Sequence, residues 1–509
     1  MDLFTKRIIL YELKINTFFD TNDSGVGDFN GILTKLEYFK KLNVNYVVLD
    51  NVLNQYQNEF NLDVIRTKYG SVKDFVKLVR GFYENNIKIA PTLDLVSVKQ
   101  SYINWCNMMS LYNLDKDKES PQYLTRLDPY LINKDIQKIS LSEIANFIRY
   151  FEEILDFYLK LDIKAIVLDN FEFLIKSNLK DETKFQFLED LYKIIKRKRP
   201  EITIILKSNT DNVILLEQLL LTKSICFDYL YVNSISTLNN KEDLKHNKKN
   251  NLNFQQLFKL LEVLLKDKRA IISLGSDLSG RMISKWGNEK AYFNESAKSF
   301  FSLLYAANNS IGIYYGDEIG MLRAKINNNF DFNNEDYNEE KRYYQSKNIN
   351  SEEYFKYQWY FNKWTSYTWM SWNNDRFAGA TKSNPQKVPC ALNYSYINVK
   401  NQLDNKESSL NYVYFLNKFI FDSDYTEFLN SAKLNIRYNK KGIFKITKKS
   451  RNKRITFLIN ISNKHNKVVP LNEYSILSST YANKFYSDTP KTLGPFESLI
   501  LFKEFKDQK

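Results

Sequence analysis

Two charged residues stand directly after consecutive apolar runs, where their side chains could take part in chemistry. Asp169 follows Ala165–Leu168, and Lys207 follows Ile202–Leu206. A carboxylate at such a place can act as a nucleophile or a base. The ammonium of a lysine holds its proton too tightly at neutral pH to act as an acid, unless burial lowers its pKa strongly.

The segment Asp20–Asp28 carries oxygen-bearing side chains at nearly every second position. Such spacing can wrap a hard cation such as Ca²⁺ or Mg²⁺, with Gly25 and Gly27 allowing tight turns. An ordinary Asp/Asn/Gly turn explains the same residues equally well, so both interpretations stay open.

Histidine is scarce in this chain. The two histidines, His246 and His465, lie in polar segments, and neither ends an apolar run. A histidine-based mechanism or metal site is therefore not expected.

Short apolar runs alternate with amphipathic stretches along most of the chain. The runs typical of buried strands are Ile8–Leu13, Tyr46–Leu49, Ile87–Leu95, Ala165–Leu168, Ile202–Leu206, Tyr229–Val232, Ala270–Leu274 and Ile311–Tyr315. Stretches typical of helices include Ile32–Leu42, Val72–Asn85, Leu141–Leu161 and Lys184–Lys196. This alternation predicts an α/β fold, a parallel (β/α)8 TIM barrel.

In such a barrel the site forms where strands end and loops begin. The residues at these places are Asn51, Asp94, Asp169, Lys207, Asn233, Ser276 and Asp317. Because the fourth and fifth strands would be neighbours, we expect Asp169 and Lys207 to form an ion pair.

Three segments depart from the alternation. Residues 97–138 are long for a barrel loop and predict a small inserted excursion domain. Residues 325–350 have almost no apolar anchor and predict a solvated or mobile loop. From about Leu429, short strands without long helices predict a C-terminal antiparallel β-sandwich. The expected domains are thus a barrel over 1–425 and a sandwich over 429–505.

Composition narrows the class of protein further. The net charge of +14 is spread as lysine among Asn, Ile, Tyr and Phe, a composition like that of AT-rich mollicute genomes. There is no basic stripe with interleaved aromatic residues, so no nucleic-acid partner is expected. No apolar run is long enough to span a bilayer, and the start does not resemble a signal peptide. The three scattered cysteines indicate a reducing compartment, so we expect a cytoplasmic protein.

Several ordered blocks resemble the α-amylase family of glycoside hydrolases, most closely its oligo-1,6-glucosidase and trehalose-6-phosphate hydrolase branch. Phe18–Leu33 resembles that family's first barrel loop, DxNxDGxGDxxGI, and Tyr69–Phe75 resembles its FGTxEDF. Tyr314–Met321 resembles YxGxEIGM, and Trp369–Trp372 resembles PMQW. The resemblance covers nearly the whole chain.

The resemblance implies a retaining glycosidase, in which a nucleophile and an acid/base carboxyl group lie about 5 Å apart. The nucleophile position matches Asp169, whereas the acid/base position falls on Lys207. The arginine of the family motif FRxD, which aligns the nucleophile, is replaced by Val167.

The positions that hold sugar in the family are also altered. Of its Tyr-Asp pair, Asp63 remains, and its first sugar-binding histidine falls on Lys99. A gapless register, favoured by Arg281, puts Asp277 on a second histidine and Leu278 on the third carboxylate. A slip of one residue would return Asp277 to the carboxylate role. We take Asp63, Lys99, Asp277 and Arg281 as substrate-binding candidates.

In the first loop, the resemblance implies five cation ligands. They are Asp20, Asn22, Ser24, the backbone carbonyl of Val26, and Asp28. Because Ser24 replaces an aspartate, a charge is lost and Ca²⁺ or Mg²⁺ should bind weakly.

These substitutions predict an eroded catalytic centre. The expected function is a non-hydrolytic sugar-binding, regulatory or scaffold role, with a carbohydrate ligand and a protein partner such as an active homologue. The alternative is an active hydrolase of α-glucosides or phosphorylated disaccharides that uses a relocated acid, Glu172 or Asp277.

Overall fold

The computed structural model describes residues 6–50, 52, 65–95, 141–172, 181–221, 226–238, 252–327, 335–350, 352, 359–481 and 489–505. The inserted domain predicted at 97–138 lies outside these residues, and so do Asp63 and Lys99.

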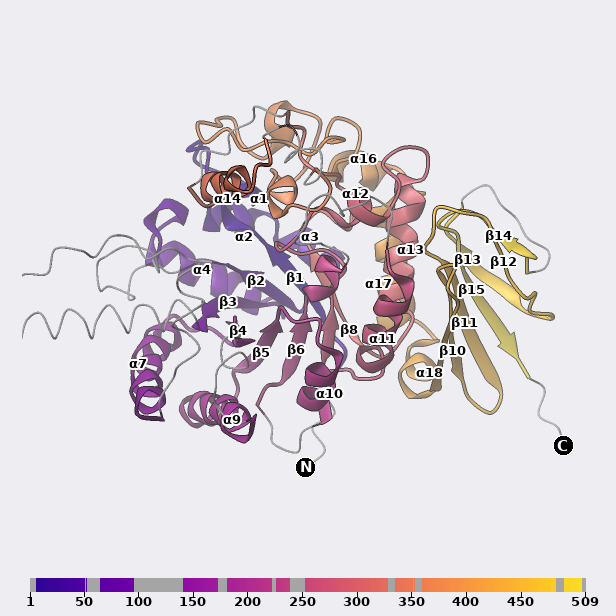
Figure 1. Ribbon diagram of the computed structural model, residues 1–509, viewed down its shortest axis with the longest axis horizontal. Helices are drawn as coiled ribbons and strands as arrows, with labels where there is room; N and C mark the ends of the chain where they lie inside the picture. Colours follow the sequence, from indigo (N-terminus) through magenta and orange to yellow (C-terminus); the bar gives the residue numbers. More distant parts are fainter. Residues whose placement is uncertain are drawn as a thin grey trace, which may run out of the picture. The chain divides into compact units, whose positions relative to one another are not determined.

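Eight parallel strands close into a barrel in the order β1 to β8, as the alternation predicts (Figure 1). Nearly all strand residues are buried, because both faces of a parallel sheet are covered. The strands are β1 Ile9–Leu13, β2 Tyr46–Leu49, β3 Lys88–Asp94, β4 Ala165–Asp169, β5 Thr203–Ser208, β6 Tyr229–Val232, β7 Ala270–Ile272 and β8 Ser310–Tyr314.

The helices follow from amphipathic spacing and from capping residues. In α4, Phe75, Leu78 and Phe82 lie on one buried stripe, and Ser71 and Asp74 form a capping box at the start. The α-helices are α1 Ile15–Phe18, α2 Phe29–Thr34, α3 Leu36–Lys41, α4 Val72–Tyr83, α7 Leu141–Lys160, α9 Asp181–Lys198, α10 Val213–Leu221, α11 Phe254–Leu264, α12 Met282–Trp286, α13 Phe293–Tyr305, α14 Glu335–Ser346, α16 Val399–Asp404, α17 Ser409–Phe421 and α18 Thr426–Ser431.

The helix predicted over Ile32–Leu42 is divided into α2 and α3. At Lys35 the backbone leaves the helical region, with φ −98° and ψ 13°. The hydroxyl of Thr34 donates to the carbonyl of Gly31, which competes with regular helical bonding. The ammonium of Lys35 lies 3.6 Å from the ring centroid of Phe19, so the break places this side chain over an aromatic face.

The last part of the chain forms antiparallel sheets, as predicted. Five strands pair in the order β13-β15-β11-β10-β9, and β12 pairs with β14. Leu493 of β14 packs with Ile443, Leu458 and Leu499 of the larger sheet in one buried cluster. The strands are β9 Lys433–Tyr438, β10 Ile443–Lys449, β11 Lys453–Asn460, β12 Asn466–Lys467, β13 Ser475–Ser479, β14 Thr492–Leu493 and β15 Ser498–Glu504.

The mobile loop predicted over 325–350 is wrong for much of its length, because α14 occupies residues 335–346. Tyr337 is its apolar anchor: the side chain is buried against Trp364, with the ring centroids 5.9 Å apart. Glu340 accepts hydrogen bonds from the indole of Trp364 at 3.1 Å and from the amide of Asn362 at 2.6 Å. Tyr337 and Glu340 thus anchor a helix that the polar composition of this segment did not predict.

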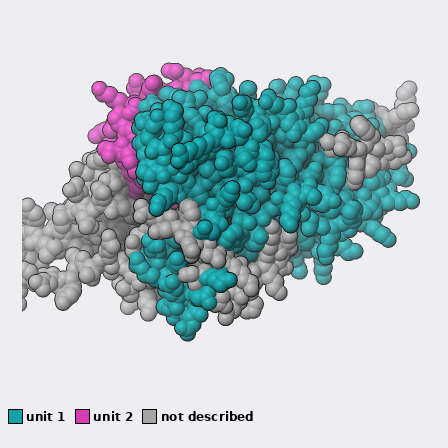
Figure 2. Space-filling model, turned by 90° about the horizontal axis from the view of Figure 1, so that it is seen from above, with its two compact units in different colours: residues 1–45, 211–220, 232–509 teal, residues 46–210, 221–231 magenta. Residues whose placement is uncertain are grey.

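Contacts divide the chain into two compact units, coloured in Figure 2. The first comprises residues 1–45, 211–220 and 232–509, and the second residues 46–210 and 221–231. This division does not test the domain boundary predicted near 425–429, which stays a prediction. Asp169 and Lys207 belong to the second unit, and Asp277 and Arg281 belong to the first.

Candidate functional site

Strands β4 and β5 bring Asp169 and Lys207 together. The two strands are parallel, and Leu168 pairs with Leu206, so the residue after each occupies the same register step. The Nζ of Lys207 lies 3.2 Å from Oδ2 of Asp169, and the side chains are 2 % and 12 % exposed. The ion pair predicted from the sequence is confirmed.

Amide groups surround the carboxylate of Asp169. Its Oδ1 accepts from the side-chain amide of Asn209 at 2.9 Å and from the backbone N–H of Asn170 at 2.6 Å. Asn170 has a φ of 61°, a left-handed conformation that asparagine tolerates better than most residues. The Asn170 side chain also donates to Asp94 at 3.0 Å. The carboxylate of Asp169 therefore accepts hydrogen bonds within a polar network.

Glu172 lies beside this network. Its Oε1 accepts from the backbone N–H of Asn209 at 2.5 Å and from the hydroxyl of Ser208 at 3.2 Å. Its Oε2 is buried with no hydrogen-bond partner among the described residues. Burial, with a smaller contribution from the charge of Asp169, raises the pKa of Glu172 to about 7. Near neutral pH this carboxyl group can therefore hold a proton and donate it.

Val167 is the residue that the sequence resemblance aligns with the arginine of the family motif, and that alignment stays a prediction. It is fully buried in β4, where it pairs with Thr92 of β3 and Ile205 of β5. An aliphatic side chain there cannot donate hydrogen bonds to Asp169. Lys207 and the amide groups supply the donors instead.

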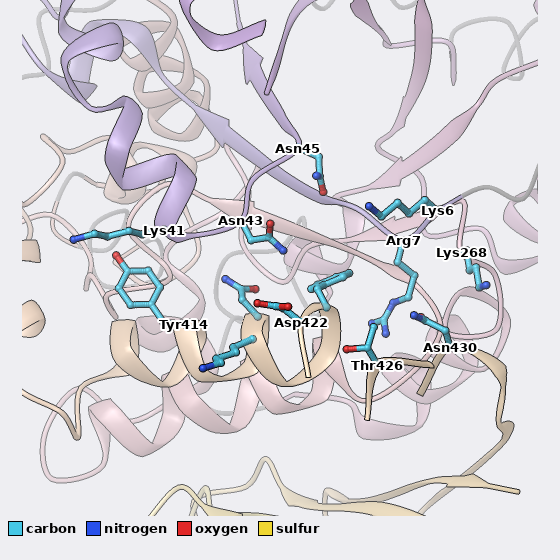
Figure 3. Close-up of a pocket in the computed structure, with 13 residues that line it drawn as sticks. Lys6, Arg7, Lys41, Asn43, Asn45, Lys268, Tyr414, Asp422, Thr426 and Asn430 are labelled. Atoms are coloured by element: carbon cyan, nitrogen blue, oxygen red, sulfur yellow. The ribbon is translucent and has the colours of Figure 1, made fainter. Parts of the chain in front are cut away.

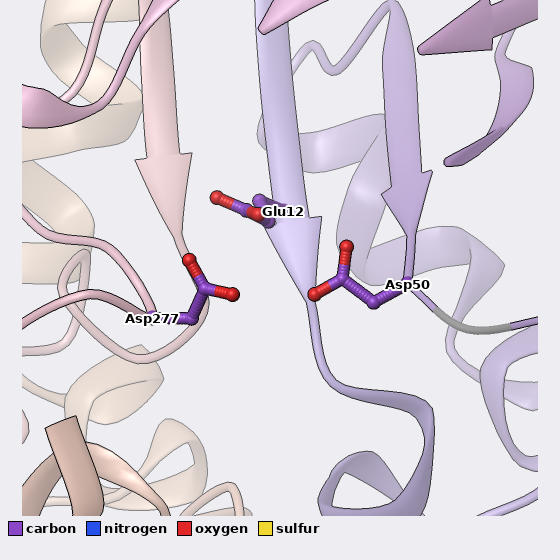
Figure 4. A group of neighbouring side chains, drawn as sticks. All are labelled: Glu12, Asp50 and Asp277. Atoms are coloured by element: carbon purple, nitrogen blue, oxygen red, sulfur yellow. The ribbon is translucent and has the colours of Figure 1, made fainter. Parts of the chain in front are cut away.

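In the first unit, Asp277 follows β7 and pairs with a lysine that sequence reasoning did not single out. The Nζ of Lys14 lies 2.7 Å from Oδ2 of Asp277. Figure 4 shows Asp277 near Glu12 of β1; it also draws Asp50, which belongs to the second unit. The nearest carboxylate oxygens of Glu12 and Asp277 lie within 4.8 Å. Two acidic groups at this spacing offer oxygen ligands that a divalent cation could take.

Arg281, predicted to bind substrate, is turned into the protein. Its side chain is fully buried and donates to the carbonyl of Ser366 at 3.2 Å and the hydroxyl of Thr368 at 3.3 Å. It also lies 3.5 Å from Asp317, whose pKa is raised to about 7 by burial. These contacts are those of a structural brace, so contact with a substrate stays a prediction.

The loop predicted to hold a cation is closed by its own hydrogen bonds. Asp20 accepts from the N–H of Gly25 at 2.8 Å and from the hydroxyl of Thr381 at 2.6 Å. Asp28 caps α2 by accepting from Gly31 N–H at 2.6 Å. The hydroxyl of Ser24 donates to the carbonyl of Val26, and the side chain of Asn22 accepts from Ser24 N–H. These hydrogen bonds close the turn, and weak binding of Ca²⁺ or Mg²⁺ stays a prediction.

Comparison with known proteins places this barrel in a family. The sequence matches the alpha amylase catalytic domain over residues 15–167 and 183–420. The match leaves out residues 168–182, the segment that contains Asp169 and Glu172. The chain belongs to the α-amylase family.

Individual relatives agree with the branch that the sequence blocks indicate. An oligo-1,6-glucosidase of Bacillus cereus is 22 % identical over 80 % of this chain and 82 % of its own length. A trehalose-6-phosphate hydrolase of Bacillus subtilis is 22 % identical over 79 % of this chain and 80 % of its own.

Solved structures share the fold. The trehalose-6-phosphate hydrolase of Bacillus licheniformis superposes with a TM-score of 0.78 at 17 % identity, covering 98 % of this chain and 99 % of its own. The isomaltulose synthase of Klebsiella sp. LX3 superposes with a TM-score of 0.75 at 15 % identity, covering 97 % and 98 %. Among the described helices, none is long and apolar enough to cross a membrane.

Proposed function

We propose that this member of the α-amylase family binds sugar without hydrolysing it and serves a regulatory or scaffold role in the cytoplasm. The ion pair between Lys207 and Asp169 carries the proposal. The pair puts a buried ammonium where the family resemblance expects an acid. It also gives Asp169, at the expected nucleophile position, a cation as its counter-ion.

The chemistry of the pair supports a non-hydrolytic role. A retaining glycosidase must protonate the leaving oxygen and attack the anomeric carbon from the other side, with two carboxyl groups about 5 Å apart. Lys207 offers an ammonium rather than a carboxyl group at this place, and that ammonium is engaged with Asp169 at 3.2 Å. Asp169, in turn, is a weaker nucleophile when a cation and two amide groups share its oxygens.

A specific observation favours a second candidate, an active hydrolase of α-glucosides or phosphorylated disaccharides. The carboxyl of Glu172 has a pKa raised to about 7 and interacts electrostatically with Asp169. A general acid works best with a pKa near the operating pH. In this alternative Glu172 donates the proton, and Asp169 must be released from Lys207 before it attacks.

Release of nitrophenol from p-nitrophenyl α-glucoside, and of glucose from trehalose 6-phosphate, separates the two candidates. The proposal expects no turnover above that of Asp169→Asn. Turnover that disappears in both Asp169→Asn and Glu172→Gln would overturn it and establish Glu172 as the acid.

Sugar binding is tested separately by titration calorimetry with glucose and maltose. We expect millimolar to micromolar binding that Lys207→Met changes, since Lys207 and Asp169 lie at the carboxyl ends of barrel strands. A chain that binds neither sugar, or binds both equally in the variant, would leave the proposed ligand class without support and overturn it.

A further inference from the structure

A pocket in the first unit lies at the opposite end of the strands from Asp277. Arg7 precedes β1, and Lys268 precedes β7, so both stand at the amino ends of barrel strands. Helix α17 and the residues up to Asn430 form the other side (Figure 3). Its volume is about 610 Å³. Small-molecule sites typically measure about 300–1,000 Å³.

The lining of this pocket is strongly cationic. Five of its side chains are lysine or arginine, and Asp422 is its one carboxylate among the described residues. The cationic residues are Lys6, Arg7, Lys41, Lys268 and Lys418. In the described part of the chain, Arg7, Lys41, Lys268 and Lys418 form no ion pair with a carboxylate. Positive charge therefore accumulates in a concave place, which raises the local concentration of anions.

Two buried donors on the wall are unsatisfied. Arg7 is 3 % exposed; its Nε donates to the carbonyl of Asn309 at 2.9 Å and its Nη2 to that of Tyr305 at 3.3 Å. Its Nη1 has no hydrogen-bond partner among the described residues, and neither does the hydroxyl of Tyr414. Figure 3 shows Arg7 reaching toward Thr426 and Asn430. Buried donors without acceptors are costly, so this wall keeps donor capacity that the described residues do not use.

A further lysine, Lys448, lies close enough to Arg7 and Lys268 for their charges to act on it. Lys448 is buried and donates to the side chain of Asn308 and the carbonyl of Leu429. Burial first, and then the charges of Arg7 and Lys268, lower its pKa to about 6. The charges of two pocket residues thus add to burial in disfavouring a charged Lys448, and a bound anion would offset that addition.

We propose that this pocket binds the phosphoryl group of a small phosphate-bearing ligand. A phosphate presents several acceptor oxygens and up to two negative charges, which suits a cavity whose lining includes a guanidinium, a hydroxyl and several ammonium groups. An uncharged sugar lacks the charge that this lining complements. The ligand is either inorganic phosphate or a phosphate ester, because the phosphoryl group is common to both.

Variants at exposed positions test the proposal with little risk to folding. Lys41 and Lys418 are exposed, so Lys41→Gln/Lys418→Gln should fold as the parent chain does. The matched control is Lys440→Gln/Lys464→Gln, which makes the same charge change at exposed residues that do not line the pocket. Asp422→Asn removes the opposing carboxylate. Titration calorimetry at low ionic strength would use inorganic phosphate, glucose 6-phosphate and glucose.

We expect phosphate or glucose 6-phosphate to bind, with affinity that falls as salt rises. The pocket variant should bind about fivefold or more weakly, the control should be unchanged, and Asp422→Asn should bind about twofold more tightly. Tighter binding of glucose 6-phosphate than of phosphate would identify an ester as the ligand; equal binding would identify the inorganic ion.

Phosphate binding that is equal in the pocket variant and the control would overturn the proposal, and so would no binding at all. Glucose binding should not respond to Lys41→Gln/Lys418→Gln, since neither lysine contributes to the ion pair at the proposed sugar site. Failure of this proposal is thereby distinguishable from failure of the proposed sugar-binding function.

Discussion

The pair of Lys207 and Asp169 is a buried interaction whose strength can be measured. Its ammonium is almost wholly removed from water, and the carboxylate is 12 % exposed. Removing one member of such a pair leaves an uncompensated charge, at a cost of about 3–5 kcal/mol, whereas replacing both is often nearly neutral.

We therefore predict that Lys207→Met lowers the free energy of unfolding by about 2–4 kcal/mol, less than the full cost because Asn209 and Asn170 still donate to Asp169. Adding Asp169→Asn should recover at least half of that loss. Urea denaturation of the four chains in this double-mutant cycle gives the coupling. Additive effects of the two changes would show that the pair does not stabilise the fold.

A second prediction concerns Glu172 and pH. Its pKa in the folded chain is raised from 4.5 to about 7, so the folded state holds this proton more tightly than the unfolded state does. Stability must then fall as pH rises from about 4.5 to 7. Asp317, whose pKa is also raised to about 7, contributes in the same direction.

Glu172→Gln should remove the contribution of Glu172 to the pH dependence of stability and leave that of Asp317. Relative to the parent chain, the variant should gain up to about 3 kcal/mol of unfolding free energy between pH 5 and pH 8. Urea titrations at the two pH values measure the difference. Parallel pH profiles for the two chains would show that burial does not raise the pKa of Glu172.

At the scale of elements, the apolar runs were sufficient to locate the strands. The strand predicted over Tyr46–Leu49 coincides with β2, and Ala165–Leu168 differs from β4 by one residue. Parallel strands with both faces covered need continuous apolar residues, which leave a clear pattern. Helix breaks leave no such pattern: the break at Lys35 accompanies a contact with Phe19, which precedes it by sixteen residues.

Helix α14 was missed for a related reason. Its polar composition predicts a solvated loop, whereas its buried side chain Tyr337 packs against Trp364 from a distant segment. We predict that Tyr337→Ala loosens α14, because a large aromatic side chain leaves a buried cluster. Limited proteolysis should then cut within 335–346 several times faster. Tyr343→Ala, at a position 38 % exposed on the same helix, is the control and should change the cutting rate little.

At the scale of the whole molecule, the family and its barrel fold were predictable from the sequence. The contacts that the site residues make were predictable only in part. The ordered blocks identified the α-amylase family, which the matched catalytic domain confirms. Register alone placed Asp169 beside Lys207. The contact of Lys14 with Asp277 joins residues 263 positions apart, and no local pattern marks it. Asn209 likewise acquires its role from the turn after β5, which the apolar pattern does not describe.

Catalysis in a barrel depends on side chains from the ends of several strands, so one reversion should not restore it. We predict that Lys207→Glu shows no α-glucosidase activity above background. The change supplies a carboxyl group at the expected acid/base position, but Val167 still lacks the donors of an arginine, and Leu278 still stands at the expected third carboxylate. Two carboxyl groups would also meet where Asp169 now has a cation, so one of them should take up a proton.

Release of nitrophenol from p-nitrophenyl α-glucoside by Lys207→Glu, compared with Lys207→Glu/Asp169→Asn, decides the matter. Equal background rates in the two chains are expected, because no single strand end carries the chemistry. Activity in Lys207→Glu that disappears in the double variant would show that Asp169 remains a competent nucleophile. Lys207 alone would then keep the protein from acting as a hydrolase. Val167 and Leu278 would be compatible with hydrolysis.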